Sequence, residues 1–208
     1  MRTKVGVKVC IANLCGLCLL AAMANSAQAS FHLWQISQVY SNASGTIQYI
    51  QFQQPAVSFD DESFLSFANL SENTFSNLYA FPTDLPSTPG PNSFFLVATP
   101  GYAAFPGVPA PDYILPTNKW FDPAGDTINY ASVVDNLTLT PGLLPTNGTQ
   151  ALFRNISTHA TITGTNFITN FAGQTGTIPV AVPEPATLSA LLAATALMLG
   201  RRPRRCPR

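Results

Sequence analysis

The sequence predicts a mainly β fold, a single antiparallel β-sandwich, because two patterns recur through the middle of the chain. Short segments rich in β-branched and aromatic residues alternate with turns that contain proline or glycine, of which the chain has 18 and 13. No stretch of the middle sustains the 3.6-residue apolar period of an amphipathic helix. Many short strands between such turns are typical of an antiparallel sandwich.

Residues 1–29 have the composition of a secretory signal peptide. A basic start at residues 1–8 precedes a mostly apolar run at 9–24, and a small-x-small sequence follows. We therefore expect an N-terminal signal helix that signal peptidase removes. The alternative is that the segment stays attached as a membrane anchor. The residues at the expected cleavage point are Ala27 and Ala29 before it and Ser30 after it.

The exported body, residues 30–171, begins with a predicted β-hairpin. Residues 33–40 and 46–52 are rich in β-branched and aromatic side chains, and a short connection ending in glycine joins them. Alternate positions of the second arm are apolar on both of its faces. We therefore expect both faces of this hairpin to be covered.

Further strands follow this hairpin. Residues 94–98 form an unbroken apolar run of strand length, which predicts a buried strand. One helical turn is predicted near residues 102–105. Residues 172–181 are rich in glycine, threonine and proline and predict a spacer. The other predicted strands are residues 73–81, 127–134, 136–140, 150–154 and 158–168.

The last segment, residues 182–208, predicts a membrane-directed tail. Its uncharged run at residues 186–200 would form a helix of roughly 22 Å. Such a helix would cross a thin bilayer with help from the apolar residues before it. Arginines after an apolar span favour the cytoplasmic side, so the body would lie outside. The alternative is a buried core helix with a basic end. The flanking motif is Val182, Pro183, Glu184 and Pro185, and the basic stop is Arg201, Arg202, Arg204 and Arg205.

This tail resembles the PEP-CTERM sorting signal of bacterial proteins that exosortases process. The resemblance rests on the Val-Pro-Glu-Pro motif at 182–185, the apolar run and the arginines. It implies an exosortase as processing enzyme, transit through the inner membrane, and delivery to the cell surface or the extracellular matrix. Pro203, Cys206 and Pro207 depart from an uninterrupted basic end.

The neutral formal charge of the whole chain hides a strongly acidic body. Between residues 30 and 182 the basic residues are Lys119 and Arg154, against nine acidic ones, which gives a net charge of −7. Such a surface repels phosphate backbones and excludes nucleic acid as a partner. All four cysteines lie outside this body. We therefore expect a domain held by its core alone, without disulfides.

The body also resembles lamin-tail-like domains, which are immunoglobulin-type sandwiches. The likeness lies in the predicted hairpin, in Ile36-Ser37-Gln38-Val39 and Tyr49-Ile50-Gln51-Phe52, and in the apolar run at 94–98. That family commonly has glutamates where Gln38 and Gln51 stand here. The resemblance implies a binding or structural module without a defined ligand.

Two acidic loops are candidates for metal binding. Asp60, Asp61 and Glu62 form the densest carboxylate cluster, and calcium takes about six to eight oxygen ligands. A solvated loop is the alternative. Asp122 and Asp126 form a second acidic loop without the spacing of an EF-hand. There the alternative is a turn stabilised by aspartate side chains.

No residue pattern predicts catalysis. Of the two histidines, His32 falls near the expected mature N-terminus, and His159 falls in a threonine-rich predicted strand, where we expect it to be a surface residue. The body has no thiol, no G-x-S-x-G or H-E-x-x-H motif and no glycine-rich phosphate loop. We expect the protein to have no catalytic activity and no cofactor. Calcium is left open as a ligand. Trp120 and Phe121, in a proline-flanked loop, are the best candidates for exposed aromatic residues that could stack on a sugar. The alternative, which is commoner for aromatic residues in a sandwich, is a place in the core or at its rim.

These patterns together predict an exported, surface-sorted, non-catalytic protein. We expect a structural or adhesive component of the extracellular matrix or exopolysaccharide layer. The alternatives are a module that binds polysaccharide or calcium, and a secreted hydrolase. The expected partners are signal peptidase, an exosortase, the membrane before processing, and exopolysaccharide.

Overall fold

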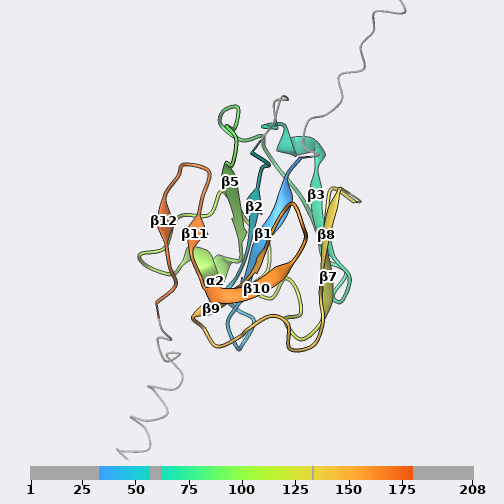
Figure 1. Cartoon of the computed structure of the whole chain (residues 1–208), viewed down its shortest axis with the longest axis vertical. Helices are drawn as coiled ribbons and strands as arrows, with labels where there is room; N and C mark the ends of the chain where they lie inside the picture. The colour runs from blue at the N-terminus through green and yellow to red at the C-terminus, as the bar shows by residue number, and fades with distance from the viewer. Residues whose placement is uncertain (1–32, 57–61, 133, 180–208) are drawn as a thin grey trace, which may run out of the picture.

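The computed structural model describes residues 33–56, 62–132 and 134–179 (Figure 1). The predicted signal helix, the sorting motif, the apolar run and the arginine end lie outside the described residues, as do Asp60 and Asp61. The described part is mainly β and contains several sheets, which confirms the predicted fold class at that level. Within these residues no helix has the length and apolar content needed to span a membrane.

The larger sheet has six strands in the order β10-β9-β1-β2-β5-β6. Its neighbouring strands pair antiparallel except for β5 and β6, which are parallel. The prediction of a purely antiparallel arrangement is therefore wrong at this edge. The chain between β5 and β6 includes helix α2 (Pro100–Ala103), which makes the connection long enough for a crossover. The strands are β1 (Gln35–Ser41), β2 (Gln48–Gln53), β5 (Phe94–Ala98), β6 (Tyr113–Ile114), β9 (Gln150–Arg154) and β10 (Thr161–Thr165).

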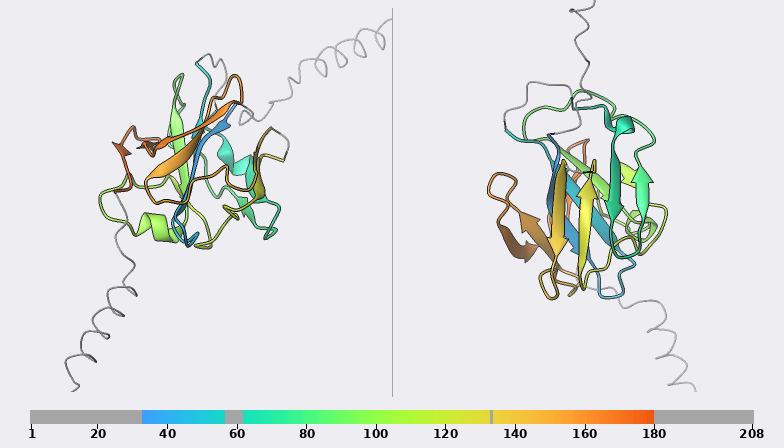
Figure 2. Two further views of the ribbon diagram at one scale, coloured as in Figure 1. Left: turned by 60° about the horizontal axis from the view of Figure 1, so that its bottom comes forward. Right: turned by 90° about the vertical axis from the view of Figure 1, so that its right-hand side faces the viewer.

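A second, four-stranded sheet has the order β4-β3-β7-β8, and all its pairs are antiparallel. Figure 2 (right) shows this sheet in front of the β1–β2 hairpin. A short two-stranded sheet, β11-β12, lies beside β5 (Figure 1). The strands are β3 (Asn69–Glu72), β4 (Leu78–Ala80), β7 (Asp126–Tyr130), β8 (Asp135–Leu139), β11 (Ile168–Thr169) and β12 (Thr175–Gly176), and a 3₁₀ turn, η1, covers Leu65–Phe67.

The main core lies between the six-stranded and four-stranded sheets. The ring of Phe52 on β2 stacks on Phe95 of β5 with centroids 4.4 Å apart, and lies 4.9 Å from Tyr130 of β7. Trp34, which precedes β1, is fully buried and meets Phe95 edge to face at 4.7 Å. Buried aromatic pairs of this kind stabilise a fold beyond the area that they remove from water. A core of this kind holds the domain together without a disulfide.

The β1–β2 hairpin is present as predicted, and both of its faces are covered. Ile50 and Phe52 face the main core, whereas Tyr49 belongs to a second apolar cluster on the outer face of the sheet. There the rings of Tyr40 and Tyr49 stack with centroids 5.2 Å apart. Helix α2, β11 and the chain after β12 cover this second cluster, contributing Tyr102, Ile168 and Ile178.

The predicted spacer at residues 172–181 differs from the structure, which describes it as far as residue 179. Thr175–Gly176 pairs with β11, and the side chain of Ile178 is only 5% exposed. The amide of Ile178 donates to Asn166 Oδ1 at 2.6 Å, and Asn166 Nδ2 donates to the carbonyl of Ile178 at 3.3 Å. The folded domain therefore extends beyond residue 171. The composition of the segment is typical of a linker, so it did not indicate that Ile178 would be buried and would attach the segment to the domain.

Replacing Ile178 by alanine is expected to lower the free energy of unfolding by about 2 kcal/mol, the low end for a core isoleucine. The reason is that its side chain is buried in the second apolar cluster, to which Tyr40, Tyr49 and Tyr102 also belong. Urea denaturation measures the change. Ile162→Ala is the matched control, because Ile162 on β10 is 65% exposed and its truncation should change stability little. Equal effects of the two substitutions would contradict a structural role for residues 172–179.

Two other elements differ from their predictions for local reasons. The helical turn begins at Pro100 rather than near residue 102, since proline suits the first turn of a helix. The predicted strand at 73–81 forms only at Leu78–Ala80. Its first half is a turn, and the unpredicted strand β3 precedes that turn.

Candidate functional site

Of the two basic residues in the body, Arg154 is buried in an ion pair. Its Nη1 lies 2.6 Å from Asp135 Oδ2 and its Nη2 lies 2.9 Å from Asp135 Oδ1, with both side chains about 95% buried. Lys119 is exposed, and its Nζ lies 5.0 Å from the centroid of the Phe75 ring. Among the described residues, Lys119 is thus the lysine or arginine whose charge is accessible to an anion in solution.

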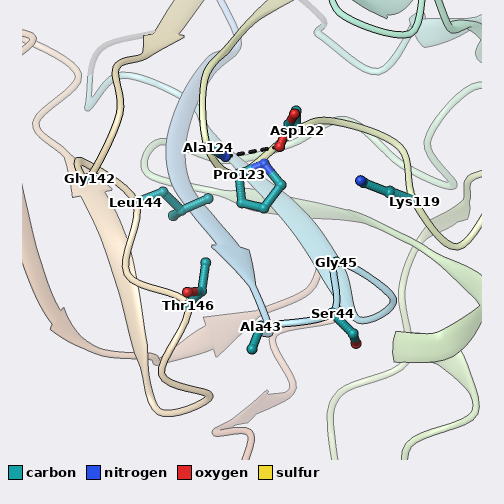
Figure 3. A pocket seen from close by; sticks show the side chains of 10 residues that line it. All are labelled: Ala43, Ser44, Gly45, Lys119, Asp122, Pro123, Ala124, Gly142, Leu144 and Thr146. Carbon is teal, nitrogen blue, oxygen red and sulfur yellow. Dashed lines mark hydrogen bonds between the residues drawn. The ribbon is translucent and has the colours of Figure 1, made fainter.

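Lys119 lines an open pocket of about 350 Å³ where three loops meet (Figure 3). The β1–β2 turn contributes Ala43–Gly45, the loop before β7 contributes Lys119 and Asp122, and the loop after β8 contributes Leu144 and Thr146. Small side chains and a proline make up most of its wall. In Figure 3 Pro123 lies beside Asp122, with Lys119 of the same loop on one side of it and Leu144 on the other. The pocket combines one positive and one negative group on a wall that is otherwise made of small polar and apolar residues.

The predicted acidic loop at Asp122 and Asp126 has a structural role. Asp126 Oδ1 accepts hydrogen bonds from the amides of Asn73, Thr74 and Thr127 at 2.7 to 3.1 Å. Its Oδ2 accepts the amide of Asp122 at 3.0 Å, and Asp122 Oδ1 accepts the amide of Ala124 at 3.0 Å (Figure 3). These contacts are the turn stabilised by aspartate side chains that the sequence left open as the alternative.

The other acidic candidate, Glu62, is separated from solvent. It is 0% exposed, its Oε2 accepts the amide of Leu33 at 3.3 Å, and its carbonyl accepts the indole N–H of Trp34 at 2.8 Å. The part of the chain that the structure describes contains no group of three or more histidine, cysteine, aspartate or glutamate side chains able to hold a metal ion. The positions of Glu62, Asp122 and Asp126 therefore give no support to the calcium hypothesis.

Glu72 on β3 lies against Asp126 and forms a buried carboxyl pair with it. Its Oε1 and Oε2 accept the amides of Asn77 and Phe75 at 2.5 and 2.8 Å. Burial raises the pKa of Glu72 above its ordinary 4.5, and the Asp126 carboxyl raises it further, whereas the two amide hydrogen bonds lower it. Burial likewise raises the pKa of Asp112, against hydrogen bonds from the Phe171 and Leu96 amides.

As the pH falls, the folded chain is expected to take up protons at Glu72 and Asp112 at a higher pH than the unfolded chain does. Each carboxyl has a higher pKa in the folded chain than in the unfolded chain, so its protonation stabilises the fold. This stabilisation is fully present below the unfolded pKa values of 4.5 and 3.8, and it is lost as the pH rises through the folded pKa values. Carboxyl ¹³C chemical shifts during a pH titration measure the midpoints directly. Midpoints at or below the unfolded values would contradict the assignment of burial as the dominant cause.

The structure places the candidate exposed aromatic pair and one of the two histidines. Trp120 and Phe121 are both 0% exposed, so they belong to the core, which was the alternative to an exposed pair. Gln48 explains their burial, because its side chain binds the backbone of both residues. His159 is exposed, as expected, but lies in the turn between β9 and β10 with a φ of 59°. His32 lies outside the described residues.

A second opening, which we call the outer groove, lies on the outer face of the six-stranded sheet and holds about 270 Å³. Glutamines 38, 51 and 53 line it together with the phenylalanines 94, 153 and 167. This set was not predicted from the sequence, although the glutamines alternate with apolar residues along the hairpin. That alternation was the available signal, since it places amides on one face of a strand pair.

The outer groove and the pocket at Lys119 are thus two openings, among the described residues, that a ligand could enter. The first is built from amides and aromatic rings, and the second from loop residues with one lysine and one aspartate. Comparison of the chain with protein-family models and with curated proteins found no match.

Proposed function

We propose that this chain is an exported, surface-sorted, non-catalytic protein that serves as a structural or adhesive component of an extracellular matrix or exopolysaccharide layer. The observation that carries the proposal is the contrast between the ends and the middle. The ends hold all four cysteines and eight of the ten basic residues, whereas the middle has a net charge of −7. Basic, apolar ends are typical of export and sorting signals, and an acidic middle suits a soluble secreted product.

We further infer that the domain is an immunoglobulin-type β-sandwich related to lamin-tail-like domains. Support comes from the shared core of the two larger sheets and from the opening hairpin, in which Gln38 pairs with Gln51 across the strands. In that family such domains bind partners or give structure. The proposal of a non-catalytic role is in keeping with that use.

The processing steps follow from the two ends of the chain. Signal peptidase would cut after Ala29, and the tail would hold the body outside the inner membrane. An exosortase would then act near the Val-Pro-Glu-Pro motif at 182–185 and release the body to the cell surface. The apolar run and the basic stop would keep the chain in the membrane until that step.

Replacement of the motif residues 182–185 by alanine tests the sorting step in the natural host. The variant is expected to remain in the inner membrane, because its apolar run and arginines are intact while the processing motif is gone. Replacing Pro207 and Arg208 by alanine is the control and should leave sorting unchanged. Normal surface delivery of the motif variant, or a full-length chain dissolved in the cytosol with both ends uncut, would refute the proposal.

Polysaccharide binding is the second candidate function, and the outer groove favours it. The groove combines aromatic rings with amide side chains, which are the groups that a sugar surface can meet. If the domain binds the exopolysaccharide of its host, adding that polymer should raise its melting temperature. An unchanged melting temperature at saturating polymer would remove this candidate.

A further inference from the structure

Four glutamine side chains form two cross-strand pairs on the outer face of the β1–β2 hairpin. Gln35 pairs with Gln53 and Gln38 pairs with Gln51 in the antiparallel register. Their neighbours Ile36 and Phe52 point into the main core, so the glutamines point away from it. An apolar cluster covers the other end of the same face, around Tyr40 and Tyr49. The outer groove opens where this cluster ends and the amides begin.

Gln38 is the polar centre of the outer groove. Its side chain is 1% exposed, and its Nε2 donates to the Tyr49 hydroxyl. Its Oε1 has no hydrogen-bond partner, and neither does Oε1 of Gln35. Buried polar atoms are rarely left without a partner, so each such atom calls for an explanation. A ligand hydroxyl would supply the missing donor after a small rotation of the Gln38 amide.

Gln51 differs from Gln38 because the protein already anchors it. Its Oε1 accepts the amide of Thr169 on β11 at 2.7 Å, which ties the β11–β12 sheet to the floor of the groove. That contact holds Phe167, two residues earlier, at the rim. The floor and one wall of the groove are thus fixed to each other before any ligand arrives, which lowers the ordering cost of binding.

Aromatic rings form the apolar part of the groove. Phe167 is 53% exposed, and Phe153 on β9 is half-buried. The ring of Phe153 lies over Gly164 of β10, where a Cβ atom would stand only 3.2 Å from Phe153 Cε2. The missing side chain at Gly164 therefore leaves room for this ring to approach the backbone of β10. Partly exposed rings beside amide groups suit the alternating C–H and O–H surfaces of a sugar ring.

The charges around the groove favour a neutral ligand. No carboxylate is among its lining residues, and the Arg154 guanidinium there is engaged by Asp135 and by the carbonyl of Ile36. The exposed Lys119 lines the other pocket. A body with a net charge of −7 would repel an acidic polymer. The groove thus lacks the groups that would bind a cation or an anion.

We propose that the outer groove is a binding site for a neutral polysaccharide, with Gln38 donating or accepting hydrogen bonds to sugar hydroxyls and Phe153 and Phe167 packing on the sugar rings. Its volume of about 270 Å³ lies just below the usual range of small-ligand pockets, which suits one or two sugar units of a longer chain. The inference rests on the proposed function, because export to a matrix would place the domain among such polymers.

Affinity electrophoresis of the chain, in the form isolated from its host, tests the site with dextran, a mixed-linkage β-glucan and mannan as neutral probes and alginate as the acidic one. We expect at least one neutral polymer to retard the protein and alginate to have less effect. Phe167→Ala should weaken binding by about three- to tenfold, as expected for loss of one stacking ring. Phe67→Ala is the matched control, since Phe67 on η1 is 72% exposed and lies outside the groove.

A second measurement isolates the amide. The side-chain ¹⁵N signal of Gln38 should shift on addition of the retarding polymer, and Gln38→Leu should abolish retardation. Binding to none of the neutral polymers, stronger binding to alginate, or equal losses for Phe67→Ala and Phe167→Ala would overturn the inference. Sorting is scored separately. A surface-delivered protein that binds no glycan refutes only the site, whereas a glycan-binding protein that stays in the cytosol refutes the proposed function.

Discussion

Replacing Arg154 by alanine is expected to lower the free energy of unfolding by about 3–5 kcal/mol, because it leaves a buried carboxylate without its partner. Asp135 on β8 belongs to one sheet and Arg154 on β9 to the other, so the pair joins the two sheets. Asp135 Oδ2 also accepts the amide of Ile36 at 2.8 Å, and Arg154 donates to the carbonyl of that residue at 3.3 Å. Thermal unfolding should show a melting temperature lower by about 10 °C.

A double-mutant cycle separates this pair from general packing. Asp135→Ala and Arg154→Ala together should lose clearly less stability than the sum of the single losses, since the second change removes a charge already left alone. Lys119→Ala serves as the control, because this exposed cation should change stability by no more than about 0.5 kcal/mol. Additive losses, or an effect of Arg154→Ala no larger than that of Lys119→Ala, would show that the ion pair does not join the sheets.

Replacing Gln48 by leucine is expected to cost about 3 kcal/mol or more, because it leaves three buried backbone groups without partners. Gln48 is fully buried, its Nε2 donates to the carbonyl of Phe121 at 2.8 Å, and its Oε1 accepts the amides of Trp120 and Phe121 at 2.8 and 3.2 Å. The loop that carries Trp120 should then separate from β2. A red shift of tryptophan emission, together with urea denaturation, measures both effects.

Gln53→Leu is the matched control for this experiment. Gln53 lies on the same strand but faces outward and is only half-buried, so the same chemical change should alter stability by about 0.5 kcal/mol at most. Unchanged tryptophan emission in Gln48→Leu would contradict the role of this amide in holding the loop.

The parts of the fold that local pattern determines were predictable. Residues 94–98 and 150–154 are strands with the predicted bounds, and the opening hairpin pairs as expected, because uninterrupted or alternating apolar residues between turn signals suffice to specify a strand. Strand β3 and the two-residue strand β6 were missed. Neither segment has a sequence pattern that predicts a strand, and each becomes a strand only because it pairs with a partner elsewhere in the chain.

The candidate sites depended even more on contacts between distant segments. Nothing near Trp120 in the sequence shows that a glutamine 72 residues earlier binds its amide. The outer groove likewise combines residues of the opening hairpin with Phe153 and Phe167, which come more than 90 residues later. By contrast, the turn built on Asp122 and Asp126 is local, and the sequence analysis included it as an alternative.

The tethering of Ile178 leaves very little chain between the folded body and the motif that begins at Val182. The four peptide units from Ile178 to Val182 reach at most about 14 Å, which is little more than the width of a single helix with its side chains. A protease acting at that motif would therefore work almost in contact with the domain surface. Its active site would need a shallow, exposed entrance, and the released product would carry a stub of only a few residues instead of a long, free stalk.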